Sequence, residues 1–457
     1  MPAALAAGLA GVLVPTVASA HALSGRLQSP LPFVAYVAGA GVAVAVSFLL
    51  IALSDPGPPA DAQSGRIRTV PALVRVPLRA LGLLGWLWVV AQTIIGGSSD
   101  GDVASLFLWV YGWIGLAILS ALVGPVWRWV DPFTTLHDLG AWLLRRLHVQ
   151  GIRPHPWPER LAIWPAVIGF AFFVWLELVP KVGDGRLLGM TLIAYTLITL
   201  AGMSQYGRDA WRERGETFGV WFALLGRLAR HALVEDGSDR RVQRRPFGAG
   251  LVSEAWTVAL LALLALGTGS IIYDGLSQTE VFFELFGIPN TMTGTLIMGA
   301  FLAVLVGAVL FVARRVGSAA MGAGLLPVAV GYLIAHYHST LLIDGQRIVV
   351  ALSDPLQQGW DLFGTAFTDA QTAWLPTEVM WTIQVGAVVV GHVVGAWAGH
   401  AAARRSADGQ TEPRRSQLPL AILMVALTAI TLWSLGQNLV FEGHETMAGA
   451  ARALAGL

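Results

Sequence analysis

The chain of 457 residues contains no cysteine and few charged residues. Without cysteine it forms no disulfide, no thiolate metal site and no thiol nucleophile, so any metal ion must be held by histidine, carboxylate, the amino terminus or backbone groups. Only 12% of the residues are charged while 55% are hydrophobic, whereas soluble domains carry about 25% charged residues. The composition indicates a membrane protein, whose first partner is the lipid bilayer.

Other sequence features that would indicate particular functions are also lacking. The formal net charge is +1, and no arginine cluster is interleaved with aromatic residues, so we expect no nucleic-acid partner. The sequence has no P-loop, no dinucleotide fingerprint and no HExxH helix. These absences argue against ATP-driven transport and against the usual zinc proteases.

Ten apolar runs are long enough to cross a bilayer, which needs roughly 20 residues per helix. They lie near residues 31–54, 78–97, 106–126, 161–180, 187–204, 254–273, 294–313, 321–343, 376–399 and 418–440. Little chain remains between the runs for a soluble domain. We therefore predict an all-α fold, a polytopic transmembrane helical bundle of about ten spans in which residues 21–457 form one domain. The expected location is the plasma membrane.

Residues 1–20, MPAALAAGLAGVLVPTVASA, predict a signal peptide, because Ala18, Ser19 and Ala20 form a small-residue end directly before His21. The segment starts without Lys or Arg, which keeps an uncleaved anchor helix as the alternative. If cleavage follows Ala20, the mature chain begins with His21, whose α-amino group and imidazole can chelate one metal ion. His21 is thus a candidate metal ligand, against the alternative of chance placement.

The arginines and lysines predict the sidedness of the spans, because cytoplasmic loops hold the excess of basic residues. With the mature amino terminus outside, the inner loops hold 24 of the 29 basic residues, and the outer loops 98–105 and 274–293 hold none. We therefore predict that both termini lie outside.

The long inner segment 205–253 contains RGETFGVWFALLGRLARHAL. Its apolar residues recur at helical spacing with arginines between them, which predicts an amphipathic helix on the inner leaflet; they are Phe218, Trp221, Phe222, Leu225, Leu228 and Leu233. The stretch from Gly124 to Leu136 reads in the same way, with Pro132 ending a helix at the interface.

Four ionisable side chains are expected in the outer third of the membrane: Glu177, Asp274, His336 and His338. Such groups are costly inside a bilayer, so they are usually paired or line a functional site. The two histidines lie about 200° apart around a regular helix, so at most one is central. We favour His336, because a stripe of small residues at spacing four lies beside it, Gly331, Ala335 and Ser339, and such stripes allow close helix packing. A structural hydrogen bond is the alternative for either histidine.

The ninth span repeats the small-residue stripe, with Gly391, Gly395 and Gly399 at spacing four and with His392 and His400 each following a glycine. By the rise of a helix, His392 is about 8–13 Å deeper than His336, so the two are not expected to share one metal ion. We expect His392 to act as a supporting group or in a proton relay, and His400 to lie at the inner interface.

Several stretches spread over nearly the whole chain resemble the fenitrothion hydrolases, a family of integral membrane proteins. They are HALSGRLQSPLP, FVWLELVP, RGETFGVWFALLGRLA, SIIYDGLSQT, AHYHSTLLIDGQ, SDPLQQGWDLFG and GHVVGAWAGH. The resemblance implies hydrolysis of an organophosphate ester. It carries no assigned catalytic residue to this chain.

Three functions remain open on the sequence. The first is hydrolysis of a neutral, lipid-soluble phosphotriester, with a divalent metal ion such as copper or zinc held by histidines, with His336, Asp274 and Glu177 as ligands or general base, and with Ser339 and Tyr332 orienting the substrate. The second is copper handling or transport, with His21 receiving the ion and His336, His338 and His392 along the path. The third is a structural subunit of a homo- or hetero-oligomeric membrane complex.

Overall fold

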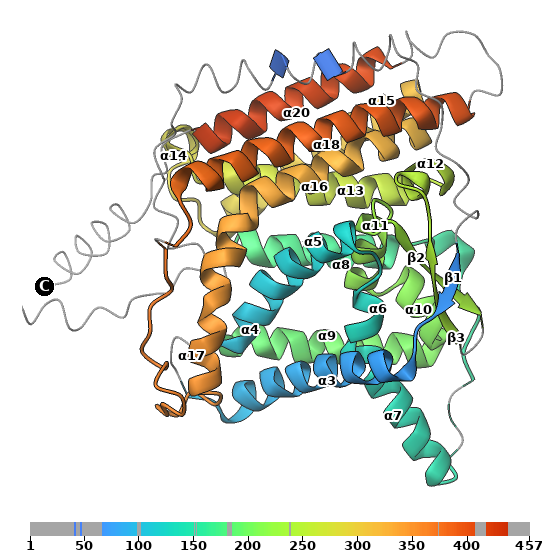
Figure 1. The fold of residues 1–457 in the computed structure, drawn as a ribbon, viewed down its shortest axis with the longest axis vertical. Helices are drawn as coiled ribbons and strands as arrows, with labels where there is room; N and C mark the ends of the chain where they lie inside the picture. The colour runs from blue at the N-terminus through green and yellow to red at the C-terminus, as the bar shows by residue number, and fades with distance from the viewer. Residues whose placement is uncertain are drawn as a thin grey trace, which may run out of the picture.

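The computed structural model describes residues 41–42, 46–47, 66–97, 102–149, 151, 153–180, 185–236, 239–372, 374–406 and 417–436. Long helices run roughly parallel and stack in layers (Figure 1). The first predicted span, near 31–54, lies largely outside the described residues, and so do the predicted signal peptide and His21.

The long helices account for most of the described chain. They are α3 (Ala72–Ile95), α8 (Trp164–Leu178), α9 (Gly185–Tyr206), α13 (Val258–Ser277), α15 (Thr291–Val316), α16 (Ser318–Ile343), α18 (Thr377–Ser406) and α20 (Leu418–Gly436). One further span is composite, made of α4 (Val103–Ser105), the π-helical stretch η2 (Leu106–Leu116) and α5 (Ala117–Leu122).

Shorter elements connect the long ones. They are α6 (Trp127–Val130), α7 (Pro132–Arg146), η3 (Glu159–Leu161), α10 (Arg208–Arg214), α11 (Thr217–Leu225), α12 (Ala249–Ser253), α14 (Glu280–Phe286), η4 (Asp344–Arg347) and α17 (Ile348–Ser353). The strands β1 (Ile67–Thr69), β2 (His231–Asp236) and β3 (Asp239–Arg244) form a small antiparallel sheet in the order β1-β3-β2. The fold is therefore helical, with one small sheet that the sequence analysis did not predict.

Among the described residues, eight helical segments are long and apolar enough to cross a membrane, and each overlaps one of the predicted runs. They are Ala72–Ile95, Val103–Leu122, Glu159–Leu178, Gly185–Tyr206, Val258–Ser277, Thr291–Val316, Ser318–Ser353 and Thr377–Arg405. The tenth predicted run corresponds to a shorter apolar helix, Leu418–Ser434. By helix length and composition, the chain is a multi-pass membrane protein. The exact number of spans and the sides of the termini stay predictions.

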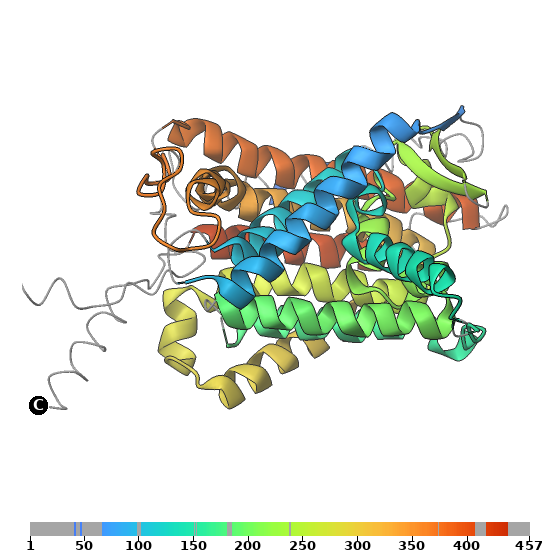
Figure 2. The same ribbon diagram turned by 90° about the horizontal axis from the view of Figure 1, so that it is seen from below.

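Loops that were assigned to the same side of the membrane meet at the same end of the bundle. At one end, β1 pairs with β3, and Asp138 of α7 forms ion pairs with Arg79 and Arg208. At the other end, Gly97 donates a backbone hydrogen bond to Leu356. Figure 2 shows the sheet and the segment after α17 at opposite ends of the helices. The arginine-rich loops thus share one face, as the predicted alternation of spans requires.

The absolute orientation leads to a labelling prediction. The chain has no native cysteine, so a single introduced thiol reports its own side of the membrane. Asp369 and Glu213 are both exposed, at the two opposite ends of the bundle. We expect an impermeant maleimide added to intact cells to label Asp369→Cys, and to label Glu213→Cys only after the cells are opened. The reverse pattern would show that the orientation is inverted.

The predicted amphipathic helix near 218–233 is wrong in extent and in position. Helix α11 ends at Leu225, and Leu233 belongs to β2. Trp221 and Phe222 are each 1% exposed, and the Trp221 ring lies 4.7 Å from the Phe170 ring between centroids. Helix α11 is therefore packed inside the bundle against α5, α8 and α13, and does not lie on a leaflet surface.

Ionisable side chains at both ends of α11 stabilise this short helix inside the protein. Glu216 accepts hydrogen bonds from the backbone N–H groups of Phe218 and Gly219 at the first turn. The guanidinium of Arg245 donates to the carbonyls of Gly226 and Arg227 just beyond the last turn. An acid at the start and a cation at the end of a helix match its dipole. Glu216 belongs to the stretch that indicated a surface helix, and Arg245 lies further along the same inner segment 205–253.

The prediction that Pro132 ends a helix is correct in part. Helix α6 ends before Asp131, and Pro132 then occupies the first turn of α7, a position that needs no backbone N–H. Asp131 accepts hydrogen bonds from the backbone N–H groups of Phe133 and Thr134 and so caps this second helix. A proline that ends one helix here begins the next.

The predicted small-residue stripes bring α16 and α18 together, and this is the most extensive helix–helix contact in the described chain. A Cβ atom placed on Gly331 would stand 2.4 Å from the carbonyl oxygen of Ala387, and one on Gly395 would stand 2.4 Å from that of Gly324. No side chain fits at either position. The glycines therefore set the distance between the two helices, and with it the position of the polar residues that α16 carries.

Candidate functional site

Asp274, near the end of α13, is the centre of a buried polar cluster. It is 3% exposed, and its Oδ2 lies 2.9 Å from Nε2 of His336 and 3.0 Å from the hydroxyl of Tyr337, both on α16. Gln278, one turn further along α13, donates to Oδ1 at 2.8 Å. Both oxygens of the carboxylate are thus hydrogen-bonded, as a buried carboxylate requires.

The hydrogen bond to Asp274 determines which nitrogen of His336 can react. When Nε2–H donates to the carboxylate, Nδ1 is left as the acceptor nitrogen of a neutral imidazole. Nδ1 is buried and has no hydrogen-bond partner in the part of the chain that the structure describes. The carboxylate therefore orients the ring and leaves one nitrogen able to take up a proton.

Gly275 allows other side chains to pack closely beside His336. A Cβ atom at this position would stand 3.1 Å from Oγ of Ser434, 3.3 Å from the hydroxyl of Tyr332 and 3.6 Å from Cε1 of His336. The Tyr332 hydroxyl lies next to Ser434 without a well-aligned hydrogen bond to any described residue. Two hydroxyl groups and a histidine ring, from α16 and α20, thus meet beside a glycine of α13.

Glu177, at the end of α8, lies beside this cluster. It is 9% exposed, it interacts electrostatically with Asp274, and its Oε2 is buried without a hydrogen-bond partner among the described residues. The Tyr337 ring separates the cluster from the aromatic core, with its centroid 6.3 Å from that of Trp113. An unpaired carboxyl oxygen in such surroundings is costly and is typical of functional sites in membranes.

The other predicted site residues are placed differently. His338 is turned away from Asp274, and its Nδ1 bonds the carbonyl oxygens of Ile334 and Ala335 on its own helix, at 3.1 and 3.3 Å. As expected, one histidine of the pair is central and the other is not. Ser339 is buried on α16, and no hydrogen bond connects it to Asp274 in the described residues.

His392 belongs to a separate polar contact deeper in the bundle. Its Nδ1 lies 2.7 Å from the carbonyl oxygen of Val388, and its Nε2 bonds the hydroxyl of Thr428 on α20. The neighbouring Gly391 packs against Pro327 and Gly331, nine and five residues before His336 on α16. These separations correspond to about 7–13 Å along a helix. The expectation that His392 and His336 do not share a metal ion stays a prediction.

A metal site does not follow from these positions. Within the described ranges, no three His, Asp or Glu side chains are grouped closely enough to hold a metal ion. Nε2 of His336 and Oδ2 of Asp274 bond each other, which leaves Nδ1 of His336 as a single nitrogen donor at this place. The residues present do not fit the predicted ion, so we derive no chemical step through it.

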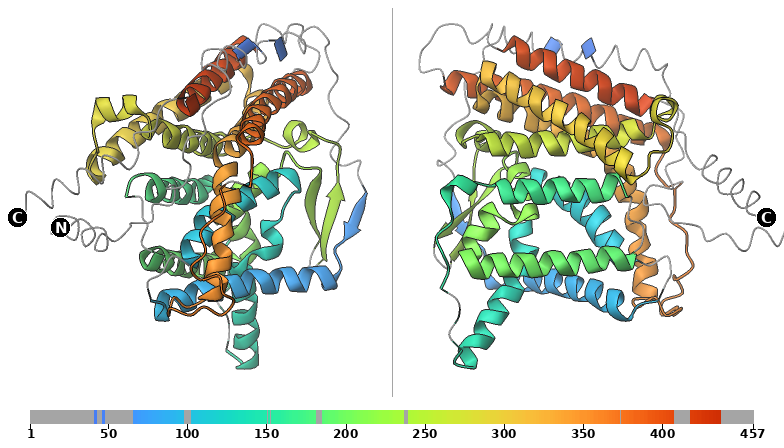
Figure 3. Two further views of the ribbon diagram at one scale, coloured as in Figure 1. Left: turned by 60° about the vertical axis from the view of Figure 1, so that its left-hand side comes forward. Right: turned by 180° about the vertical axis from the view of Figure 1, so that it is seen from behind.

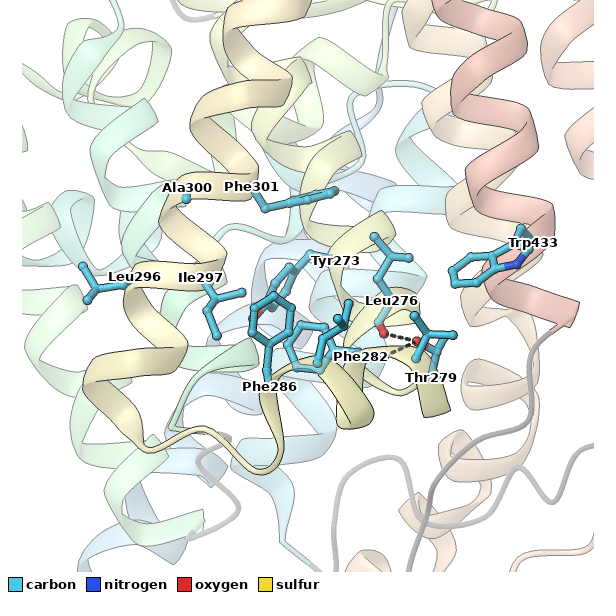
Figure 4. A pocket seen from close by; sticks show the side chains of 12 residues that line it. Tyr273, Leu276, Thr279, Phe282, Phe286, Leu296, Ile297, Ala300, Phe301 and Trp433 are labelled. Atoms are coloured by element: carbon cyan, nitrogen blue, oxygen red, sulfur yellow. Dashed lines mark hydrogen bonds between the residues drawn. The ribbon is translucent and has the colours of Figure 1, made fainter.

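An apolar pocket of about 540 Å³ opens near the same end of the bundle, where α13, α14, α15 and α20 meet. Figure 4 shows side chains from these four helices, including Phe282, Phe301 and Trp433, around a common space. Tyr273 lines the pocket and directly precedes Asp274, while Trp433 directly precedes Ser434. The pocket and the polar cluster therefore use adjacent residues of the same two helices.

Sequence reasoning missed four members of the cluster: Gly275, Gln278, Tyr337 and Ser434. Gly275 and Gln278 lie in SIIYDGLSQT, and Tyr337 stands between the two histidines, so all three were in stretches already singled out. Ser434 carried a weaker signal, because it is one of three hydroxyl residues, with Thr428 and Thr431, in the apolar run of α20. None could be assigned without knowing which helices are neighbours.

Comparison of the chain with protein-family models, with curated proteins and with solved structures gave no match. The resemblance to the fenitrothion hydrolases remains an expectation. The function must therefore be argued from the site itself.

Proposed function

We propose that the protein is a membrane-embedded hydrolase that acts on a neutral, lipid-soluble ester, of which an organophosphate triester is the expected class. One observation carries this proposal. The buried Asp274–His336 pair leaves an acceptor nitrogen on a ring that packs beside Gly275, and an apolar pocket lies near the same end of the bundle. An oriented imidazole of this kind is the usual general base of hydrolytic sites.

The proposed reaction uses only residues of this cluster. Nδ1 of His336 takes a proton from a water molecule as the oxygen of that water attacks phosphorus. The bond from phosphorus to the aryloxy group breaks, and the protonated histidine returns the proton to the leaving oxygen. Asp274 holds the ring and stabilises the imidazolium that forms, while the hydroxyl of Tyr332 donates to the phosphoryl oxygen, where negative charge develops. Ser434 supports this site from α20, where its hydroxyl donates to the carbonyl oxygen of Thr431 at 2.8 Å.

The location of the cluster suits a substrate that dissolves in lipid. His336 is seven residues from the end of α16, which corresponds to about 10 Å along the helix. A neutral triester reaches that depth through the bilayer, whereas an anionic diester does not. The apolar pocket accepts the aryl or alkyl groups, and the polar cluster accepts the reacting centre. This division is usual in small-molecule sites, where apolar walls bind and a few polar groups react.

The proposal is tested with purified protein in lipid nanodiscs, by following release of the phenol from a neutral aryl dialkyl phosphotriester such as the oxygen analogue of fenitrothion, which carries the phosphoryl oxygen that the proposed reaction needs. We expect turnover of the triester and none of the corresponding diester. Release no faster than from nanodiscs without protein would overturn the proposal.

A substitution in the pocket tests whether it binds the apolar part of the substrate. Ala300 lines the pocket on α15, and Ala303 is an exposed alanine of the same helix that does not line it. We expect Ala300→Phe to raise KM about tenfold or more with little change in kcat, because a lost apolar contact of this size is worth about 1–3 kcal/mol. Ala303→Phe is the matched control. Equal KM values for the two variants would show that the pocket takes no part.

A further inference from the structure

The helix α7 projects from the arginine-rich end of the bundle with a row of uncovered leucines. Leu136, Leu139, Leu143 and Leu147 recur at spacings of three and four, which places them on one side of the helix. The last three are 49%, 50% and 62% exposed. A continuous apolar row of this kind does not remain in water in a folded protein without a partner.

Helix α7 is firmly attached to the rest of the protein, although its leucines are exposed. Asp131 caps its first turn, and Asp138 in its middle lies 2.7 Å from Arg79 and 3.0 Å from Arg208. Burial acts to raise the pKa of the Asp138 carboxyl group, but the nearby His137 ring and the hydrogen bonds from Arg79 and Arg208 lower that pKa below its usual value. The carboxylate therefore stays ionised at neutral pH and fixes α7 against α3 and α10.

The direction of the helix and its neighbours indicate what covers the leucines. Helix α7 runs steeply across the direction of the long helices at the end that carries the sheet (Figures 1 and 3). It packs against α3, whose outward side is apolar, with Leu81 and Leu84 each 64% exposed. The leucine row of α7 thus continues a surface that already faces lipid.

The charges of α7 are complementary to the boundary of a bilayer. Arg145 and Arg146 are exposed in its last turn, and the Arg146 guanidinium lies 5.4 Å from the centroid of the Trp142 ring. Tryptophan and arginine are the residues that anchor proteins at the level of the lipid headgroups. Helices that combine an apolar row with arginines lie in the plane of the interface.

We propose that α7 is an interfacial anchor that binds the surface of the leaflet on the arginine-rich side. Leu139, Leu143 and Leu147 are buried among the upper acyl chains, while Arg145 and Arg146 contact the phosphates of anionic headgroups. The occupant of this surface is lipid and not another protein. The proposal does not depend on the hydrolytic site, which lies at the opposite end of the bundle.

The full chain without native cysteine allows a direct test. Leu143→Cys and Ala141→Cys place a polarity-sensitive fluorophore on opposite sides of α7, because the two positions lie about 200° apart around the helix. In nanodiscs that hold one copy each, we expect lipid spin-labelled near the headgroup to quench the Leu143 label several-fold more than the Ala141 label. Equal quenching, with both labels reached by aqueous iodide, would overturn the proposal.

Two further comparisons identify the partner. Replacing phosphatidylcholine by its mixture with phosphatidylglycerol is expected to increase quenching at Leu143, and Arg145→Glu with Arg146→Glu is expected to abolish that increase. If the Leu143 label is shielded from iodide only when several copies share one vesicle, and lipid does not quench it, a second copy covers the leucines and the proposal is wrong.

Discussion

Replacing His336 with glutamine is expected to lower the rate of ester hydrolysis at least 100-fold and to leave the fold intact. Glutamine keeps a side chain of similar size and can still donate to Asp274, but it has no nitrogen that accepts a proton. General-base catalysis by a placed side chain contributes about 10²–10⁴ in rate. The variant is assayed for phenol release in nanodiscs, and its thermal unfolding is measured on the same preparation.

The unfolding temperature should change little, since hydrogen bonds between helices in membranes average about 0.6 kcal/mol. His338→Gln is the matched control, two residues further along α16, because His338 bonds only carbonyl groups of its own helix in the described chain. We expect this control to retain its rate. If His336→Gln keeps full turnover, or if both variants lose activity together with stability, the role proposed for His336 is wrong.

The helices could be predicted from the sequence because hydropathy alone determines which segments enter lipid. Eight of the ten predicted runs recur as long apolar helices, and the arginine-rich loops meet at one end. The choice of His336 over His338 was also within reach of the sequence, because two positions 200° apart cannot face one point. Periodicity and composition are properties of one segment, and they need no knowledge of its neighbours.

The sequence could not show the partners of His336, because contact between helices depends on which helices are neighbours. His336 and Asp274 are 62 residues apart, and nothing in either segment specifies the other. For helix α11 the sequence led to a wrong prediction, since the helix was expected on the surface and is buried. Its apolar and arginine residues fit a surface helix as well as a buried one, and only the capping by Glu216 and Arg245 distinguishes the two. Polar residues in the apolar segments of a membrane protein thus indicate a candidate site, but their contacts cannot be read from the sequence.

Gly395→Leu is also expected to have a large effect, because the new side chain should push α16 and α18 apart. The new Cβ would stand 2.4 Å from the carbonyl oxygen of Gly324 and 3.1 Å from the Val328 side chain, and a rigid backbone cannot move aside. Overpacking of this kind costs about 1–3 kcal/mol and occasionally more. We expect a lower yield of folded protein, a lower unfolding temperature and loss of hydrolysis, because α16 carries both His336 and Tyr332.

Gly386→Leu on the same helix is the control for this prediction, because a Cβ at Gly386 has no described neighbour within 4 Å. The helix propensity of leucine exceeds that of glycine by up to about 1 kcal/mol, so propensity alone would make both variants more stable. At Gly395, contact therefore predicts a loss of stability and propensity a gain, whereas at Gly386 only propensity acts and a gain is expected. Equal unfolding temperatures for the two variants, measured in detergent by fluorescence-detected size exclusion after heating, would show that the glycine contact does not set the distance between α16 and α18.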